Sequence, residues 1–308
     1  MSEQHLSLFK FFERFPNEEA ARLYFEAQRW GETATCGHCG STEVTECKNH
    51  KPMPYRCKSC RKHFSVRTGT VLAESRLPLQ KWALAMYMMT TARKGISSVQ
   101  MAKELGVTQK TAWFLAQRIR ETWMGNDGNK DNDFNSTVEV DETFIGGKER
   151  NKHNKKKLKS GRGTVGKTAV IGMKNRSGNV VAQPISNTKA YTLKGFIKAN
   201  VQEGATVVTD AFTGYKGLSG YNHLTVNHSV GEYVRDQAHT NGIESFWALL
   251  KRGHYGIYHY MSPKHLHRYV TEFSYRHNTR DLTTMDYINT TITKSAGKRL
   301  TYAELINA

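Results

Sequence analysis

The stretch Thr137-Val-Glu-Val-Asp-Glu-Thr-Phe144 alternates apolar with polar residues and is rich in β-branched side chains. Both features are typical of a half-buried β-strand. Counting in steps of two puts Glu139, Asp141 and Thr143 on one face of this strand and the apolar side chains on the other. The stretch therefore predicts a sheet that buries one face in a core and carries acids on the other.

The segments after this strand continue with strand and helix patterns. They are a hairpin of 168–173 and 179–185 around a turn at 175–178, a helix over 191–200, a buried strand over 205–210, a strand near 224–228, and helices over 241–251 and 263–277. Strands and helices mixed in this way predict an α/β domain with a mixed sheet rather than a β-sandwich.

Upstream of the strand the hydrophobic period is helical. From Pro78 to Trp123 the apolar residues recur at helical spacing, with breaks at Gly95 and Gly106. A polar, turn-forming stretch over 124–136 follows, and we expect a domain boundary there. Near the N-terminus, Asn17 is placed to cap a further helix.

The chain of 308 residues has room for about two domains. Its 45 Lys and Arg exceed its 27 Asp and Glu, which gives a net charge of +18 and indicates a polyanionic partner. With 38% hydrophobic and 10% aromatic residues, the chain is too apolar to be wholly disordered. No apolar run approaches the ~20 residues that span a bilayer, and the N-terminus lacks the pattern of a secretion signal. We therefore expect a cytoplasmic protein.

Four cysteines form two Cys-x2-Cys pairs, Cys36 with Cys39 and Cys57 with Cys60, separated by 17 residues. This spacing predicts one tetrahedral zinc site. Four thiolates leave no open position for a catalytic water, so the predicted zinc, one per chain, is structural. The alternative is a set of reduced core cysteines. Other candidate ligands are His38, His50 and His63, whereas Cys47 is expected to be a small buried residue.

The segment 96–120 resembles a helix-turn-helix. Ala102 lies where two helices would cross, Gly106 makes the turn and Thr108 caps the second helix. The polar or basic side chains on that helix, Gln109, Lys110, Arg118 and Arg120, are candidates for contacts in a major groove. The alternative is an ordinary pair of packed helices.

Three acids in the second half occupy different settings. Asp141 lies on the first strand, Asp210 ends the strand over 205–210, and Glu244 lies on the helix over 241–251 with Lys251 two turns further on. If these carboxylates converge they repel one another unless cations lie between them, and their hard oxygens suit Mg²⁺ or Mn²⁺. The alternative is three unrelated surface acids.

A basic run over 148–167 holds nine Lys and Arg and one acid, Glu149. We expect it to bind the DNA backbone, above all through Lys155, Lys156 and Lys157, because clustered cations release counterions from DNA. A solvated loop is the alternative. A group of five histidines over 254–277 is expected to serve packing and phosphate contacts rather than a second metal site.

Several motifs, in this order, together resemble the bacterial insertion-sequence DDE transposases that carry an N-terminal zinc ribbon and an ISXO-like catalytic domain. The motifs are Cys36-Gly-His-Cys39, Phe64-Ser-Val-Arg-Thr-Gly-Thr-Val71, Val138-Glu-Val-Asp-Glu-Thr-Phe-Ile-Gly-Gly-Lys148, Thr209-Asp-Ala-Phe-Thr-Gly-Tyr215, His239-Thr-Asn-Gly-Ile-Glu-Ser-Phe-Trp247, Lys264-His-Leu-His-Arg-Tyr269 and Phe273-Ser-Tyr-Arg-His-Asn-Thr-Arg280. The resemblance covers most of residues 8 to 280.

The resemblance implies a ribonuclease-H-like catalytic domain of the retroviral-integrase type. In it Asp141, Asp210 and Glu244 are the catalytic acids that hold two Mg²⁺ or Mn²⁺ ions, and Lys251 is the basic residue that follows them. Some relatives have an asparagine in place of the third acid, so Asn241, one helical turn before Glu244, is the alternative to Glu244 or an accessory to it. We choose Glu244 because a carboxylate is the better ligand for a hard cation. The implied domains are a first helix with the zinc ribbon over 1–75, a helix-turn-helix region over 76–125, the catalytic domain over 134–290 and a tail over 291–308.

The activity that the resemblance implies is transposition. Such an enzyme binds the terminal inverted repeats of its element, cleaves the DNA there with water, and joins the released 3′-hydroxyl to target DNA. Because two DNA ends must meet, we expect a homodimer or a larger assembly at the nucleoid. The alternatives are a DNA-binding regulator derived from a transposase and a structure-specific nuclease of the same fold.

Overall fold

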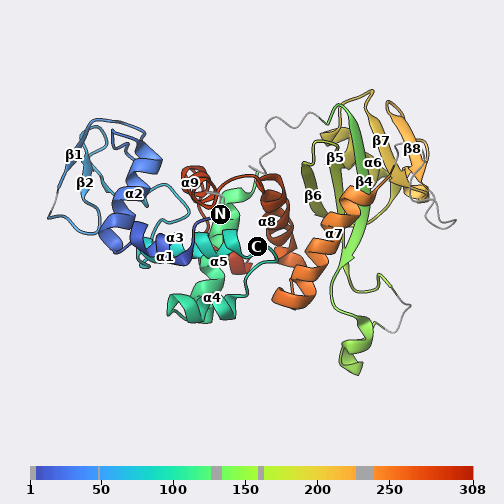
Figure 1. Cartoon of the computed structure of the whole chain (residues 1–308), viewed down its shortest axis with the longest axis horizontal. Coiled ribbons are helices and arrows are strands. Elements are labelled where there is room, and N and C mark those ends of the chain that lie inside the picture. Colours follow the sequence, from blue (N-terminus) through green and yellow to red (C-terminus); the bar gives the residue numbers. More distant parts are fainter. Residues whose placement is uncertain (1–4, 48, 126–133, 159–162, 227–238, 308) are drawn as a thin grey trace. The chain divides into compact units, whose positions relative to one another are not determined.

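The computed structural model describes residues 5–47, 49–125, 134–158, 163–226 and 239–307 (Figure 1). The chain divides into two compact units. The first comprises Met1–Asn126 together with Asp281–Ala308, and the second comprises Asp127–Arg280. Within the described parts of the chain, no helix combines the length and the apolar character needed to cross a membrane.

The first unit combines a small antiparallel sheet with helices. The sheet contains β1 (Val44–Glu46), β2 (Tyr55–Cys57) and β3 (His63–Phe64) in that order. The helices are α1 (Leu8–Arg14), α2 (Glu18–Trp30), α3 (Leu79–Thr91), α4 (Ser98–Leu105), α5 (Gln109–Trp123), α9 (Thr284–Lys294) and α10 (Tyr302–Asn307). As the sequence predicts, the side chain of Asn17 caps α2 by accepting a hydrogen bond from the Ala20 N–H.

The last 28 residues complete the first unit, although the sequence predicts a catalytic domain up to residue 290 and then a tail. The indole of Trp123 donates to Thr291 Oγ1 at 3.2 Å. Lys298 Nζ donates to the carbonyls of Glu121 and Thr122 at 3.1 and 2.9 Å, so it satisfies groups that the end of α5 leaves free. Such contacts join segments far apart in the chain, and no local pattern reveals them.

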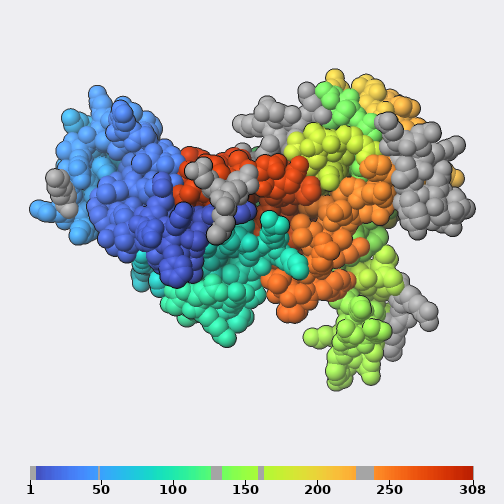
Figure 2. All heavy atoms as spheres, viewed as in Figure 1, coloured from blue at the N-terminus to red at the C-terminus, as the bar shows by residue number. Residues whose placement is uncertain are grey.

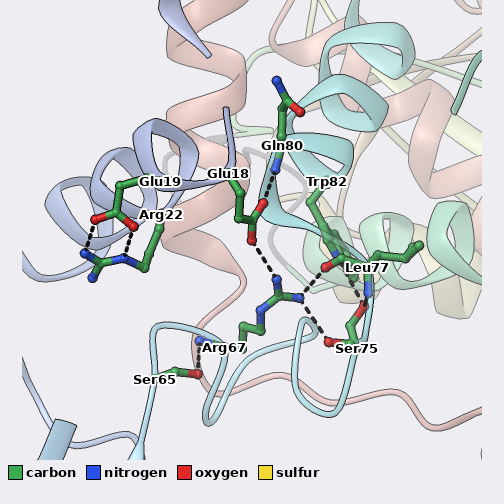
Figure 3. A network of polar contacts seen from close by, with 9 residues as sticks. All are labelled: Glu18, Glu19, Arg22, Ser65, Arg67, Ser75, Leu77, Gln80 and Trp82. Carbon is green, nitrogen blue, oxygen red and sulfur yellow. Dashed lines mark hydrogen bonds and ion pairs between the residues drawn. The ribbon is translucent and has the colours of Figure 1, made fainter. Parts of the chain in front are cut away.

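Arg67 joins the zinc-ribbon region to the helices of the same unit (Figure 3). Its guanidinium donates to the carbonyls of Ser75 and Leu77 at 3.1 and 2.6 Å and to Glu18 at 3.3 Å. The other oxygen of Glu18 accepts the Gln80 N–H at 3.1 Å. One side chain therefore fixes the segment 65–77 against the N-terminal ends of α2 and α3.

The second unit is a five-stranded sheet with helices on both faces. The strand order is β6 (Val180–Ile185), β5 (Thr168–Asn175), β4 (Thr137–Ile145), β7 (Thr206–Asp210), β8 (Asn222–Val226). Strands β4, β5 and β6 are antiparallel, whereas β7 and β8 run parallel to β4. This order and these directions are those of the ribonuclease-H-like fold, which confirms the predicted fold class. The predicted strand near 224–228 begins at Asn222, and residues 227 and 228 lie outside the described residues.

Two hydrophobic clusters cover the two faces of this sheet. Helix α6 (Ala190–Asn200) packs with Val138 and Val140 on one face. On the other face, α7 (Asn241–Gly253) and α8 (Leu266–Asn278) pack with Val170. Figure 1 shows α7 lying across the sheet over β4. A π-helical turn (His254–Tyr258) and a short 3-10 helix (Pro263–His265) connect α7 to α8.

Candidate active site and metal centre

The four predicted zinc ligands lie together. Their sulfur atoms are all within 4.8 Å of one another, with 3.7 Å between Cys36 and Cys60 and 3.6 Å between Cys39 and Cys57. A tetrahedral site with Zn–S bonds of about 2.3 Å needs S···S distances of about 3.8 Å. Among the described residues, no other group of three or more His, Cys, Asp and Glu side chains is this close. The sulfurs are thus positioned for one structural metal ion.

Backbone amides support both cysteine turns. The His38 N–H points at the Cys36 sulfur at 3.4 Å, and the Cys60 N–H points at the Cys57 sulfur at 3.5 Å. The Cys60 amide lowers the pKa of Cys57 to about 6, because its N–H favours the thiolate, which is the metal-binding form. The first turn also needs Gly37, since a Cβ there would lie 2.3 Å from the Thr68 carbonyl oxygen.

The other candidate zinc ligands lie elsewhere. The ring of His38 is 3.2 Å from the His63 carbonyl oxygen, and the ring of His50 is 2.9 Å from the Met53 carbonyl oxygen and stacks on His63. Cys47 is not in the sulfur group, as the sequence predicts, but it is half-exposed rather than buried.

Helices α4 and α5 form the predicted pair. Gly106 has the left-handed conformation, with φ of 59°, and lets the chain turn between them. The Val107 N–H donates to the Ala102 carbonyl at 3.0 Å across the turn, and Ala102 is buried at the helix contact. The Thr108 side chain caps α5 by accepting from the Thr111 N–H.

The side chains proposed for the major groove differ in exposure. Gln109 and Lys110 are exposed in the first turn of α5, where Gln109 donates to Ser98 and Lys110 lies over the Tyr302 ring. Arg118 is only 6% exposed, and its guanidinium donates to the Ala73 carbonyl. The structure therefore gives Arg118 a packing role, contrary to the expectation that it faces DNA. Arg120 is buried as well.

The acids of the second unit meet where β4 and β7 run side by side. These parallel strands pair Val138 with Val207 and Glu139 with Val208. Two residues further along, the same register brings Asp141 level with Asp210, the last residue of β7. Asp210 therefore lies at the carboxyl end of β7, where α/β sheets bind their ligands, and Asp141 lies beside it in the middle of β4.

Helix α7 brings the third acid over the same edge. Glu244 is in its first turn and exposed, and its Oε1 accepts the Thr240 hydroxyl at 2.8 Å. The helix approaches the sheet closely at Gly172, the partner of Asp141 on β5, because a Cβ there would lie 2.6 Å from the ring of Trp247. Lys251 follows Glu244 by two turns and is half-exposed.

The three acids interact electrostatically. Burial, together with the charges of Glu142, Asp210 and Glu244, raises the pKa of Asp141 to about 7. The carboxylate oxygens of Asp141, Asp210 and Glu244 do not all lie within 4.8 Å of one another. Asp210 and Glu244 are thus near enough to disfavour the ionised form of Asp141.

Sequence reasoning missed Glu142, which lies beside Asp141 on β4. Its Oε2 accepts the hydroxyl of the buried Tyr215 at 2.6 Å. Burial raises the pKa of Glu142, and the charge of Asp210 raises it further. Alternation along the strand turns Glu142 to the opposite face from Asp141, so counting by two excluded it from the acid set.

The ISXO2-like transposase domain family matches residues 133–278, and the transposase zinc-ribbon domain family matches residues 16–63. A protein of transposable element ISH50 from Halobacterium salinarum, described as uncharacterized, is 30% identical over 251 residues, which cover 77% of this chain and 83% of that protein. The chain belongs to the ISXO2-like transposase family. Family membership makes it a DNA-cutting enzyme in general terms, with a zinc ribbon ahead of the transposase domain.

Two solved transposase structures are also similar to this transposase at a low level. A Mos1 transposase paired-end complex with the left transposon end has a TM-score of 0.27 and 9% identity, covering 69% of this chain and 78% of that one. A pre-cleavage Mos1 transpososome has a TM-score of 0.25 and 10% identity, covering 71% and 80%. We therefore assign the fold from the strand order of the second unit and not from these two structures.

The basic segment of the transposase follows β4. In Figure 1 it projects beyond the end of that strand, and Figure 2 shows the same segment as a protrusion from the surface. It contains the short 3-10 helices Glu149–Asn151 and Asn154–Lys156. Lys155 and Lys156 are exposed, whereas Lys157 is half-exposed and donates to Asn154 at 2.9 Å. Residues 159–162 of the predicted run lie outside the described residues.

Proposed function

We propose that this transposase cuts DNA at the terminal inverted repeats of an insertion sequence and joins the cut end to target DNA. The observation that carries the proposal is the convergence of Asp141, Asp210 and Glu244 from β4, β7 and α7, in which the pKa of Asp141 rises to about 7. An acid with a perturbed pKa that lies beside other acids near the carboxyl end of a strand is typical of catalytic sites.

The donor set fits divalent cations. Asp141, Asp210 and Glu244 offer hard carboxylate oxygens, and their mutual repulsion is relieved by positive charge between them. When bound, two Mg²⁺ or Mn²⁺ ions supply a clamp on the attacking and leaving oxygens of a phosphodiester. In the first transfer, water attacks at the element's end and a 3′-hydroxyl leaves. In the second, that hydroxyl attacks a phosphodiester of target DNA, and the 3′-oxygen of the target strand leaves.

The neighbouring side chains have separate roles. Lys251, on the face of α7 that carries Glu244, neutralises a phosphate as a point charge. Asn241 is exposed one turn before Glu244 and is an accessory to it. A neutral amide binds a hard cation more weakly than a carboxylate does.

The first unit and the basic segment bind the DNA in this proposal. Helix-turn-helix proteins contact bases with the N-terminal residues of the second helix, and Gln109 and Lys110 hold those positions on α5. Lys155, Lys156 and Lys157 contact phosphates and add affinity without sequence information. Because two DNA ends are joined to one target, the working form is at least a dimer, and its place of action is the nucleoid in the cytoplasm.

The test is a cleavage and strand-transfer assay on a labelled terminal-repeat oligonucleotide with Mg²⁺ or Mn²⁺, beside a gel-shift assay. Asp141→Asn, Asp210→Asn and Glu244→Gln are each expected to abolish both reactions and to leave DNA binding intact, since amides keep the shape and lose the charge. Glu203→Gln, an exposed acid of the same unit, is the matched control and keeps activity. Three active acid variants would disprove the site.

The same assay separates the other functions. Lys251→Ala is expected to slow the chemistry by about 10²-fold, as removal of one electrostatic stabiliser does, and Asn241→Ala is expected to have less effect. Binding without cleavage by the unaltered chain would indicate a DNA-binding regulator. Cleavage that does not require terminal-repeat DNA would indicate a structure-specific nuclease.

A further inference from the structure

Glu139 is a buried acid that the proposed chemistry does not use. It precedes Asp141 by two residues on β4 and points to the same face of the sheet. Its side chain is only 4% exposed. Burying a carboxylate is costly unless hydrogen bonds and an opposite charge compensate, so the partners of Glu139 indicate what it does.

The partners of Glu139 lie at the start of α7 and on the turn between β5 and β6. Oε2 accepts the Ile243 N–H at 2.9 Å, and Oε1 accepts from the Arg176 guanidinium at 2.6 Å. His239 lies 3.3 Å from Oε1, and Lys174, which faces Glu139 across the strand pair, donates to the Gly242 carbonyl at 3.5 Å. The first turn of α7 is therefore tied to β4 and β5.

Glu139 acts as a helix cap. Ile243 is the third residue of α7, and its N–H is one of those that a helix leaves without an internal partner. The side chain of the N-cap residue, Thr240, makes no capping hydrogen bond and donates to Glu244 instead. A carboxylate at a helix N-terminus is also favoured by the helix dipole. Capping from the sheet thus allows the Thr240 hydroxyl to orient the third acid.

Gly242 permits this contact. A Cβ at Gly242 would lie 2.8 Å from Oε2 and 3.0 Å from Oε1 of Glu139. The carboxylate can sit against the start of α7 only because this position has no side chain. The close approach at Gly242 and the hydrogen bonds of Glu139 with Ile243 and Arg176 therefore both describe how the Glu139 carboxylate sits against the start of α7.

We propose that Glu139 is a positioning residue that fixes the separation of Asp141 and Glu244. The contact joins the residue two before Asp141 to the residue directly before Glu244, which is a short path between the two acids. The inference rests on the proposed function, because it treats these acids as one metal-binding set. Without the contact, α7 keeps its apolar packing and the Lys174 hydrogen bond to β5 but loses its bond to β4, so Glu244 is no longer kept at one distance from that strand.

The test measures Mn²⁺ binding directly, from the loss of the free-ion paramagnetic resonance signal, together with cleavage. Glu139→Ala is expected to weaken Mn²⁺ binding about tenfold or more, in line with the loss caused by removing the residues that orient metal ligands. Glu139→Gln keeps an acceptor for Ile243 and loses the charge opposite Arg176, so we expect a smaller loss. Affinity for terminal-repeat DNA is expected to stay unchanged in both.

Gly242→Ala tests the contact without removing the acid. Its Cβ displaces the carboxylate, so we expect the Mn²⁺ affinity to fall as in Glu139→Ala. Gly195→Ala in α6 is the matched control, because a Cβ there meets nothing within 4 Å, and it is expected to bind Mn²⁺ as the unaltered chain does. Glu272→Gln removes another buried acid, one paired with Arg276, and is expected to reduce stability without changing Mn²⁺ affinity.

The outcomes distinguish the two proposals. If the unaltered chain binds no Mn²⁺, or binds it equally well after Asp141→Asn, the proposed function fails. If Asp141→Asn abolishes binding while folded Glu139→Ala and Gly242→Ala bind Mn²⁺ normally, the positioning role of Glu139 is wrong and the proposed function stands. If Glu272→Gln lowers Mn²⁺ affinity as much as Glu139→Ala does, the effect is general destabilisation, and the positioning role is wrong as well.

Discussion

The cysteine site and the proposed acid site of this transposase are built on different principles. The cysteine site takes its ligands from two four-residue turns, and backbone amides within those same turns support the sulfurs. The acid site takes Asp141, Asp210 and Glu244 from three elements that are far apart in sequence. Its geometry therefore depends on strand register and on how closely α7 packs. The comparison teaches that local spacing suffices to specify the first centre, whereas only the folded sheet specifies the second.

The largest expected effect is the loss of the zinc site, whose ligands lie close together in the sequence. Cys57→Ser, or a strong chelator, is expected to remove one zinc per chain and unfold the ribbon, because binding energies of about 10–16 kcal/mol are coupled to the folding of such modules. The second unit is expected to remain folded, since its sheet has its own core. Elemental analysis and hydrogen exchange of each region check this.

Cys47→Ser is the control for the zinc prediction, because Cys47 lies outside the sulfur group and its replacement is expected to leave the zinc content unchanged. A folded ribbon without zinc, or unfolding of the second unit on chelation, would remove the contrast between the two regions.

An intermediate effect tests how the acid site is supported. The ring of His277 on α8 packs against Phe246 of α7. Burial, together with the charges of Lys174 and Arg280, lowers the pKa of His277 to about 4. The unfolded chain binds the proton more readily, so stability is present above pH ~6.5 and falls as the pH drops toward 4, by up to about 3 kcal/mol. Because other groups of the unit titrate in the same pH range, the contribution of His277 is isolated by comparing the unaltered chain with a variant that lacks this histidine.

The measurement for His277 is hydrogen exchange of α7 and α8 between pH 7 and pH 4.5, in the unaltered chain and in His277→Gln. The variant is expected to lose less stability over this range, because it has no imidazole to protonate. Equal losses in the two proteins would show that another group controls the acid response of α7.

The smallest effect concerns affinity alone. Neutralising Lys155, Lys156 and Lys157 together is expected to weaken binding to all DNA sequences about equally. The salt slope is expected to fall by roughly one unit for each phosphate that is no longer neutralised. Salt-dependent binding titrations with terminal-repeat and unrelated DNA check this. A loss of affinity confined to terminal-repeat DNA would mean that the segment contributes to sequence recognition. Our proposal assigns that role to the first unit alone.

Sequence patterns predicted the features whose cause is local. The cysteine turns, the Gly106 turn and the alternation of β4 each depend on a few neighbouring residues, and the structure has all three. The positions of Asp141 on a strand and of Asp210 at the end of another also follow from local patterns. The distance between these acids did not, because it depends on the pairing of β4 with β7.

The features that the sequence did not predict are buried polar groups and contacts between distant segments. Arg118 is a basic residue on the candidate recognition helix, as a DNA contact would be, yet its guanidinium is buried against Ala73. Glu139 alternates with apolar residues as a solvent-facing acid would, yet α7 covers it. Charge in a sequence predicts exposure only when no partner lies across the fold, and a partner such as Arg176 is not visible from neighbouring residues.

The return of the chain from α8 to the first unit has a consequence for synthesis. Residues 281–308 leave the ribosome after the second unit. Among them, Thr291 accepts a hydrogen bond from Trp123 of α5, and Lys298 donates to the Glu121 carbonyl of the same helix. During translation, the first unit therefore acquires its final contacts only after the entire catalytic unit has emerged. A chain that stops before residue 281 lacks these contacts, so a prematurely terminated product does not yield a complete first unit that competes with the full-length enzyme.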